Sequence, residues 1–304
     1  MQVGWNTLDY NNTGSGSELL RSGAGAALPI GVDALLLSVP NGDGTYTLRS
    51  PALPAQATGT GVSALEGHPA APDPATGAFT VRVPVKSIYR YFAITGQVVA
   101  RRQVVDVAKC KNCHGTLTLH GNNRTDEPLV CVICHNPNAT DIPYRQIGDG
   151  PESPLDFKYM VHAIHGTKRR QTPFVIIGRG HSINDFSDVR FPAEPSDCTV
   201  CHLPGTNALP LGSNVLGTTI VTQSTLRDGP PIVNNDPADD LNITPMAAVC
   251  SACHDSADNR RHMESRGASF AALQQQIASG VVRERCGDCH GKGKEKDVLR
   301  VHHH

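Results

Sequence analysis

The chain has 304 residues, enough for about two domains, and its hydrophobic fraction is 39% while aromatic residues make up only 5%. Its 27 basic and 28 acidic side chains leave a net charge of −1, which argues against a nucleic-acid partner. No stretch approaches the length of a transmembrane helix.

The first hundred residues are predicted to form an all-β domain, a small sandwich or barrel spanning residues 1–100. Their strand signals are short and are separated by turn residues, with no helical pattern between them. Residues 50–77 are rich in Pro, Ala and Gly and are expected to be loop. The signals are an apolar run at 30–39, a turn at 41–44, alternation at 45–49, a half-buried strand at 79–85 and a further strand at 89–95.

Residues 101–304 contain every cysteine of the chain, and each cysteine belongs to a Cys-x-x-Cys-His motif. This pattern is the attachment site of c-type heme: two thiols bond to the heme vinyl groups and the histidine ligates the iron. The five motifs are Cys110/Cys113/His114, Cys131/Cys134/His135, Cys198/Cys201/His202, Cys250/Cys253/His254 and Cys286/Cys289/His290.

Zinc sites and thioredoxin-like redox pairs also use Cys-x-x-Cys. Zinc sites normally need two pairs and five do not divide evenly, whereas a redox pair needs no following histidine. We therefore expect five covalent hemes c in a pentaheme domain of residues 101–304. With about one motif per 40 residues, this domain should be mostly irregular and sparsely helical. Short helices are predicted at 156–164 and at 270–279, the latter capped by Ser269 and stopped by Gly280.

The second axial ligand of each iron decides between electron transfer and substrate binding, because an open position lets the iron bind a substrate. Nine histidines lie outside the motifs. Two of them are spaced i, i+3, so on a helix they share a face and could serve two hemes. His181 lies in a Gly-rich loop and is a weaker candidate, and His68 is expected to be a surface residue. The five preferred distal ligands are His120, His162, His165, His262 and His302.

Several segments around these residues resemble the outer-membrane decaheme cytochromes of the OmcA/MtrC family. The resemblance covers roughly residues 80–302, and residues 5–17 are similar to the start of the second β domain of that family. The segments that carry it are RRQVVDVAKC at 101–110, CHGTLTLHG at 113–121, CHNPN at 134–138, MVHAIHG at 160–166, DFSDVRFP at 185–192, and CHGKG at 289–293 followed by DVLRVH at 297–302.

The resemblance implies a split β-barrel followed by a pentaheme domain, a pair that the family contains twice. It assigns distal ligand roles to the same five histidines, and it makes His302 part of the natural chain rather than of a tag. It also implies electron transfer at the cell surface to metal oxides, flavins or other redox proteins. The chain departs from the family in having five motifs instead of ten, which corresponds to the C-terminal half, and in lacking a further cysteine pair.

The expected function is therefore an electron-transfer cytochrome with five bis-histidine hemes and no dedicated substrate site. One alternative is a multiheme reductase with an open iron, although all five motifs end in histidine and pentaheme nitrite reductases usually have one that ends in lysine. Another is a homo-oligomer or filament in which His181, His303 or His304 completes a neighbour's site. Because bacterial thioether attachment takes place outside the cytoplasmic membrane, we expect an export signal in the precursor. The cell surface or the extracellular space is favoured over the periplasm.

Overall fold

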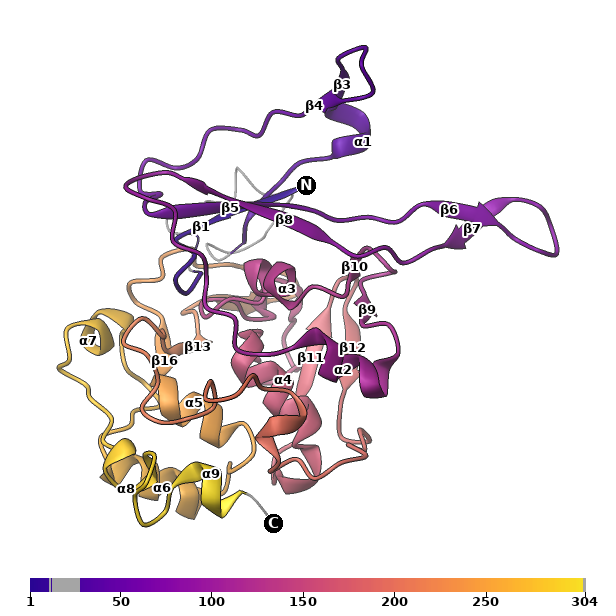
Figure 1. Ribbon diagram of the computed structural model, residues 1–304. Helices are drawn as coiled ribbons and strands as arrows, with labels where there is room; N and C mark the ends of the chain where they lie inside the picture. Colours follow the sequence, from indigo (N-terminus) through magenta and orange to yellow (C-terminus); the bar gives the residue numbers. More distant parts are fainter. Residues whose placement is uncertain (11, 13–27, 303–304) are drawn as a thin grey trace.

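The computed structural model describes residues 1–10, 12 and 28–302 of the chain, and part of segment 5–17 therefore lies outside the described residues. The N-terminal strands lie above a larger part with short helices and hairpins (Figure 1). No helix in the described ranges is long and apolar enough to cross a bilayer.

A four-stranded antiparallel sheet with the order β2-β1-β5-β8 forms the centre of the N-terminal part. Val3 pairs with Ser63, and Val62 pairs with Tyr91. Two hairpins, β3–β4 and β6–β7, project away from this sheet (Figure 1). The elements are β1 (Gln2–Trp5), β2 (Ile30–Gly31), α1 (Ala34–Leu37), β3 (Val39–Pro40), β4 (Tyr46–Thr47), β5 (Thr60–Leu65), β6 (Ala70–Pro72), β7 (Phe79–Arg82) and β8 (Ile88–Ala93).

Three expectations for this part were wrong. Residues 50–77 contain β5, a central strand, because the small residues of this segment fit between two neighbours: a side chain at Gly61 would collide with the Phe92 ring. The apolar run at 30–39 includes a helical turn, α1, whose amide groups are capped by the Asp33 carboxylate. β7 is exposed on both faces rather than half-buried, since it pairs only with β6 in a projecting hairpin.

The turn at 41–44 and the strand near 89–95 are confirmed. The Asn41 amide donates to the Thr45 carbonyl at 3.0 Å, and Gly42 and Gly44 have positive φ angles of 87° and 86° that other residues rarely adopt. The described strands form an open sheet and two hairpins, and the split barrel stays a prediction.

The part after residue 100 consists of short helices and two-stranded sheets, and its longest helices, α4 and α6, have nine residues. The strands are β9 (Thr118–Leu119), β10 (Arg124–Thr125), β11 (Val175–Gly178), β12 (Ser182–Asp185), β13 (Thr218–Val221), β14 (Thr225–Arg227), β15 (Gly229–Ile232) and β16 (Leu241–Ile243). The α-helices are α2 (Val107–His114), α3 (Pro128–Cys134), α4 (Phe157–His165), α5 (Pro245–Ser251), α6 (Ala257–Ser265), α7 (Gln274–Ala278), α8 (Gly287–His290) and α9 (Val298–Val301). Single 3-10 turns are η2 (Ile142–Tyr144), η3 (Thr167–Arg169) and η4 (Cys198–Val200).

The helix predicted at 156–164 is confirmed as α4, and the Asp156 carboxylate caps it by accepting from the Lys158 amide. The helix predicted at 270–279 is shorter. It begins at Gln274, because the preceding residues are held by Asn242 in an isolated β-bridge to Ala272. Ser269 therefore does not cap it, whereas Gly280, with a φ of 75°, follows its end as expected.

The two parts share a buried core, although the domain boundary near residue 100 stays a prediction. Val62 and Ala64 of β5 pack against Val130 and Ile133 of α3, a helix that contains two cysteines of the second motif. Gly4 permits this approach, because a Cβ there would lie 2.9 Å from Ile133 Cγ2. A second cluster, centred on α4, α5 and α6, buries Ala163, Ala247 and Met263. The N-terminal sheet thus rests directly on one of the motifs.

Candidate heme-binding sites

Each Cys-x-x-Cys-His motif adopts one helical turn or lies at the end of a short helix. In four of them, the histidine amide donates to the carbonyl of the first cysteine at 2.8–2.9 Å, while the first motif lies within α2. This turn places residues i, i+3 and i+4 on one side of the backbone, so that both thiols and the imidazole face the same region. The geometry is what a group bonded to all three side chains requires.

The ten thiols are free in the structure, with no disulfide among them. Burial raises the pKa of Cys131 and Cys250 to about 12 and that of Cys134 and Cys286 to about 11. Buried thiols of this kind stay protonated at neutral pH and are poor nucleophiles, which argues against a redox-active dithiol.

Two of the ten cysteines assigned to heme attachment do not lie in an enclosed site. Cys113 and Cys289 are exposed, whereas the other eight cysteines are partly buried. Each is the second cysteine of its motif, and the helices that hold them, α2 and α8, contain no buried residue. The polypeptide itself therefore covers these two thiols less than it covers the thiols of the second motif in α3. A thioether bond requires reach to a vinyl group rather than enclosure, and attachment at Cys113 and Cys289 stays a prediction.

Every motif histidine faces one of the five preferred distal histidines, and the ring centres of each pair are 6.0–6.1 Å apart. Two metal–nitrogen bonds of about 2 Å in line with two imidazoles would place the ring centres roughly 6 Å apart. The pairs are His114 with His165, His135 with His120, His202 with His162, His254 with His302, and His290 with His262.

The remaining histidines of the described ranges lie elsewhere. His68 contacts the carbonyl of Pro69, and His181 is within 3.0 Å of both carboxylate oxygens of Asp149. His303 and His304 lie outside the described residues. Within residues 1–10, 12 and 28–302, no three His, Cys, Asp or Glu side chains converge on a point where they could hold a metal ion, as a zinc ribbon would need.

Hydrogen bonds orient several of these imidazoles. The Nδ1 atoms of His135, His165 and His290 lie 3.1, 2.9 and 3.0 Å from backbone carbonyls, and His162 Nδ1 contacts the Lys158 carbonyl. A carbonyl only accepts, so the proton belongs on Nδ1 and the Nε2 lone pair is left for a ligand. Metal-binding histidines are commonly held in this way.

Burial also keeps several of these rings neutral, the form that binds a metal. It lowers the pKa of His135 and His202 to about 4, and it lowers the pKa of His120 and His162. For His135 and His202, the nearby imidazole of the distal partner adds to the effect.

Helix α4 contacts four of the five motifs. Its His162 faces the third motif and its His165 faces the first, while the Phe157 amide donates to the His135 carbonyl of the second at 3.0 Å. Gly166, which ends the helix, lies against the Cys253 sulfur of the fourth motif. The other helical distal histidine is His262 in α6, while His302 follows α9 and His120 lies in the β9–β10 turn.

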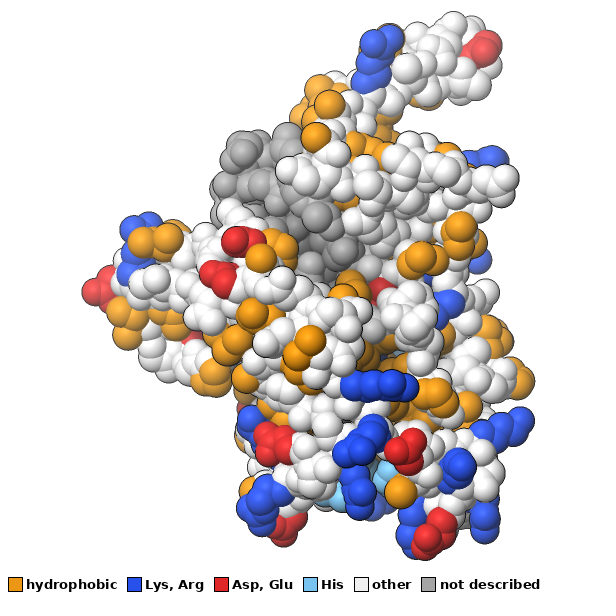
Figure 2. Space-filling model, turned by 90° about the vertical axis from the view of Figure 1, so that its left-hand side faces the viewer, with side chains coloured by type: hydrophobic (Ala, Val, Ile, Leu, Met, Phe, Trp, Pro, Cys, Tyr) orange, Lys and Arg blue, Asp and Glu red, His pale blue; other side chains and the backbone are white. Residues whose placement is uncertain are grey.

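Two large cavities adjoin these residues, and their volumes are in the range of cofactor sites. The first, of about 800 Å³, is lined by His120, His135 and both cysteines of the second motif. The second, of about 560 Å³, is shared by the third and fourth motifs with their distal histidines His162 and His302. Figure 2 shows histidine side chains reaching the surface among Lys and Arg on the lower part of the molecule.

Sequence reasoning missed the charged residues of the first cavity, which come from segments far apart in the chain. Arg124, which pairs with Glu66 at 2.5 Å, and Arg179 line its wall, as does the buried Asp240. Asp240 is close enough to Glu152 for the two charges to interact. No local motif marks these residues, and only the fold brings them to one site.

A model of the family described as outer membrane cytochrome MtrC/MtrF-like, domains II/IV, matches residues 102–303. Among solved structures, the outer membrane decaheme cytochrome OmcA is 18% identical with a TM-score of 0.47, and the match covers 100% of this chain and 42% of OmcA. MtrC from Shewanella baltica OS185 is also 18% identical with a TM-score of 0.45, and the match covers 95% of this chain and 44% of MtrC. The chain thus spans less than half the length of these two proteins. A search of curated proteins found no match. Because the family model covers more than half of the chain, the protein belongs to the MtrC/MtrF-like outer-membrane multiheme cytochromes.

Proposed function

We propose that this chain binds five hemes c, each through a Cys-x-x-Cys-His motif and one distal histidine, and relays electrons between them. The observation that carries the proposal is that all five motif histidines have a histidine partner at 6.0–6.1 Å. Bound heme would supply the redox-active iron. The protein would supply two neutral imidazoles per site and two thiols for attachment.

Heme irons whose two axial positions are both filled by histidines favour electron transfer over catalysis. A reductase needs an iron with one open side, and no motif histidine of the described residues lacks an opposing imidazole. The reductase alternative therefore has no site to support it, while the filament alternative stays a prediction. His181, one of the histidines it would use, is paired with Asp149.

Contacts between motifs support a relay in the order fifth, fourth, third, first, second. The third motif meets the first, because the Asp106 amide donates to the Cys201 carbonyl at 3.1 Å. The third motif also shares a cavity with the fourth motif. The fourth meets the segment before the fifth, since Glu284 accepts from the Met246 amide at 2.8 Å. Lys111 of the first motif pairs at 2.7 Å with Asp126, which precedes the second. Electrons could thus enter at one end and leave at the other.

The family places such cytochromes at the outer membrane. We infer that the chain works at the cell surface in extracellular electron transfer, with other redox proteins, flavins or metal oxides as partners. The domain division at residue 100 belongs to the same proposal, with the sheet supporting the site of His120 and His135 through α3.

The test is the heme content and spin state of the purified holoprotein. Mass spectrometry should give five hemes per chain, and electron paramagnetic resonance should show only low-spin signals from bis-histidine iron. His165→Ala should convert one heme to high spin, whereas His181→Ala, the matched control outside the pairs, should change nothing. A high-spin heme in the unmodified protein, or an unaltered spectrum in His165→Ala, would contradict the proposed ligation.

A further inference from the structure

A buried carboxyl group lies in the wall of the cavity that His120 and His135 share. Asp240 directly precedes β16, and its side chain is 5% exposed. Among the described residues, its Oδ1 atom has no hydrogen-bond partner. A carboxylate buried in this way loses its hydration and gains little in return, which favours the protonated form.

The groups around Asp240 add negative rather than positive charge. Glu152, Asp239 and Asp236 all repel its charged form, while the Thr219 hydroxyl on the adjacent strand β13, which donates to Asn242 Oδ1 at 3.0 Å, favours that form. Burial and these charges together raise the pKa of Asp240 to about 7. Its protonation state can therefore change under physiological conditions.

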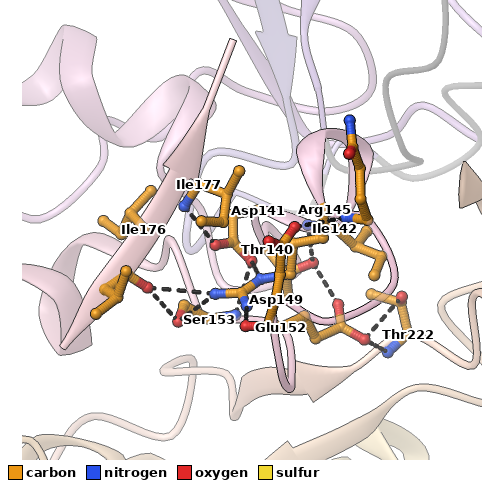
Figure 3. Close-up of polar contacts among 12 residues, drawn as sticks. Thr140, Asp141, Ile142, Arg145, Asp149, Glu152, Ser153, Ile176, Ile177 and Thr222 are labelled. Atoms are coloured by element: carbon orange, nitrogen blue, oxygen red, sulfur yellow. Dashed lines mark hydrogen bonds and ion pairs between the residues drawn. The ribbon is translucent and has the colours of Figure 1, made fainter. Parts of the chain in front are cut away.

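Glu152 is held in place and cannot turn away from this region (Figure 3). Its carboxylate accepts from the Thr140 hydroxyl at 2.5 Å and from the Thr222 amide and hydroxyl at 2.7 and 3.0 Å. Burial still raises its pKa. Two carboxyl groups that interact in a buried site titrate together, and one of them holds a proton over a wide pH range.

Of the basic side chains Arg124, Arg145 and Arg179, the first two have other acidic partners. The buried Arg145 is bonded to Asp141 at 2.6 Å and to the Asp149 carbonyl at 2.7 Å (Figure 3). On the cavity wall, Arg124 is paired with Glu66. Arg179 also lines the cavity, and its guanidinium makes no ion pair in the described part of the chain.

We propose that Asp240 is a proton acceptor that couples reduction of the iron between His120 and His135 to proton uptake. The inference rests on the proposed heme at that site. One electron arrives from a neighbouring heme, and one proton from solvent binds a carboxylate oxygen of Asp240, so that the site's net charge is unchanged. No other bond forms or breaks. Because the two events share one cavity, each favours the other by the same free energy.

Three residues of the adjoining loop 234–239 also line the cavity, and we take this loop as the path of the proton from solvent. Asp236 and Asp239 of that loop are exposed, and Asn234 donates to Asp239 at 2.9 Å. Asp239 lies one residue from Asp240 but is exposed, so Asp239→Asn removes a repelling charge without removing the proposed proton acceptor.

The experiment measures proton uptake when the full holoprotein is chemically reduced between about pH 6 and 8. The unmodified protein should take up more protons than Asp240→Asn, up to about one per molecule on the alkaline side of pH 7, whereas Asp239→Asn should keep this uptake and move it to lower pH. Glu152→Gln removes the nearest repelling charge and should move the same uptake to lower pH. Infrared difference spectra should show a protonated carboxyl band on reduction that Asp240→Asn lacks.

Unchanged proton uptake and an unchanged carboxyl band in Asp240→Asn would overturn the inference, as would an equal loss in Asp239→Asn. Heme content and spin state are measured on the same samples. Missing or high-spin hemes in the unmodified protein would count against the proposed function, whereas intact low-spin hemes with unaltered uptake would count against Asp240 alone. Should Asp240→Asn fail to fold, a Glu152→Gln uptake curve identical to that of the unmodified protein would refute the proposal.

Discussion

Replacement of Gly166 by alanine tests whether the Cys253 sulfur is fixed in place. A Cβ at residue 166 would lie well inside 3.0 Å of that sulfur, whereas favourable contacts between non-bonded carbon atoms are about 3.5–4.0 Å. A free thiol could rotate away from this contact at little cost, although the Cβ would still lie 2.7 Å from the His162 carbonyl oxygen. A sulfur joined to heme by a thioether could not, so α4 or the fourth motif would have to move.

Overpacking of this kind costs about 1–3 kcal/mol, and the fixed sulfur favours the upper end. The lower entropy of the unfolded chain offsets roughly 0.5–1 kcal/mol of it, which leaves a net loss of about 2 kcal/mol. Gly287→Ala is the control, because it also lies in a motif region but its Cβ would have only ordinary contacts of 3.6 Å or more. Urea denaturation of both holoproteins measures the difference, and equal stabilities would refute the reasoning.

Three further changes test other contacts. Arg145→Met leaves the buried Asp141 carboxylate without its cation, and urea denaturation should show a loss of about 3–5 kcal/mol; a loss below about 1 kcal/mol would contradict a structural role for the pair. Asp9→Asn weakens the bonds of this side chain to Arg101 at 3.0 Å and to the Leu216 amide at 2.9 Å, so the free energy of unfolding should fall by about 2 kcal/mol. As the control, Asp188→Asn at an exposed position should leave the free energy of unfolding unchanged. The pKa of Asp240 is raised above its unfolded value, so its contribution to stability falls as the pH rises from about 4 to about 7. The melting temperature of Asp240→Asn minus that of the unmodified protein should therefore be larger at pH 8 than at pH 4. A smaller difference at pH 8 than at pH 4 would be inconsistent with the raised pKa.

The sequence was most informative where the chemistry is local. Five cysteine pairs with a following histidine need only adjacent residues to be recognised, and α4 has both a capping Asp156 and an apolar face around its histidines. Family membership could be anticipated from the same segments. The β5 strand could not be predicted from the sequence, because Gly61 and Ala64 are poor strand formers that serve close packing here.

The surroundings of each motif were also beyond local reasoning. His262 follows the fourth motif by eight residues but faces the fifth, and His302 follows the fifth but faces the fourth. The motif pattern likewise treats all second cysteines alike, although those of the first and fifth motifs, Cys113 and Cys289, are exposed. The carboxyl pair of Glu152 and Asp240 was missed for the same reason, since 88 residues separate two side chains that meet only through β13 and β16.

The crossed pairing has a consequence for how the molecule is made. A site can be completed only when the later member of its histidine pair has emerged, and these later members occur at residues 135, 165, 202, 290 and 302. The second site is therefore the earliest that a growing or translocating chain can close, and the fourth is the last. His254 has to wait for 48 further residues while the fifth site closes inside that loop. In the proposed relay order, His302 after α9 would thus complete an interior link rather than an end.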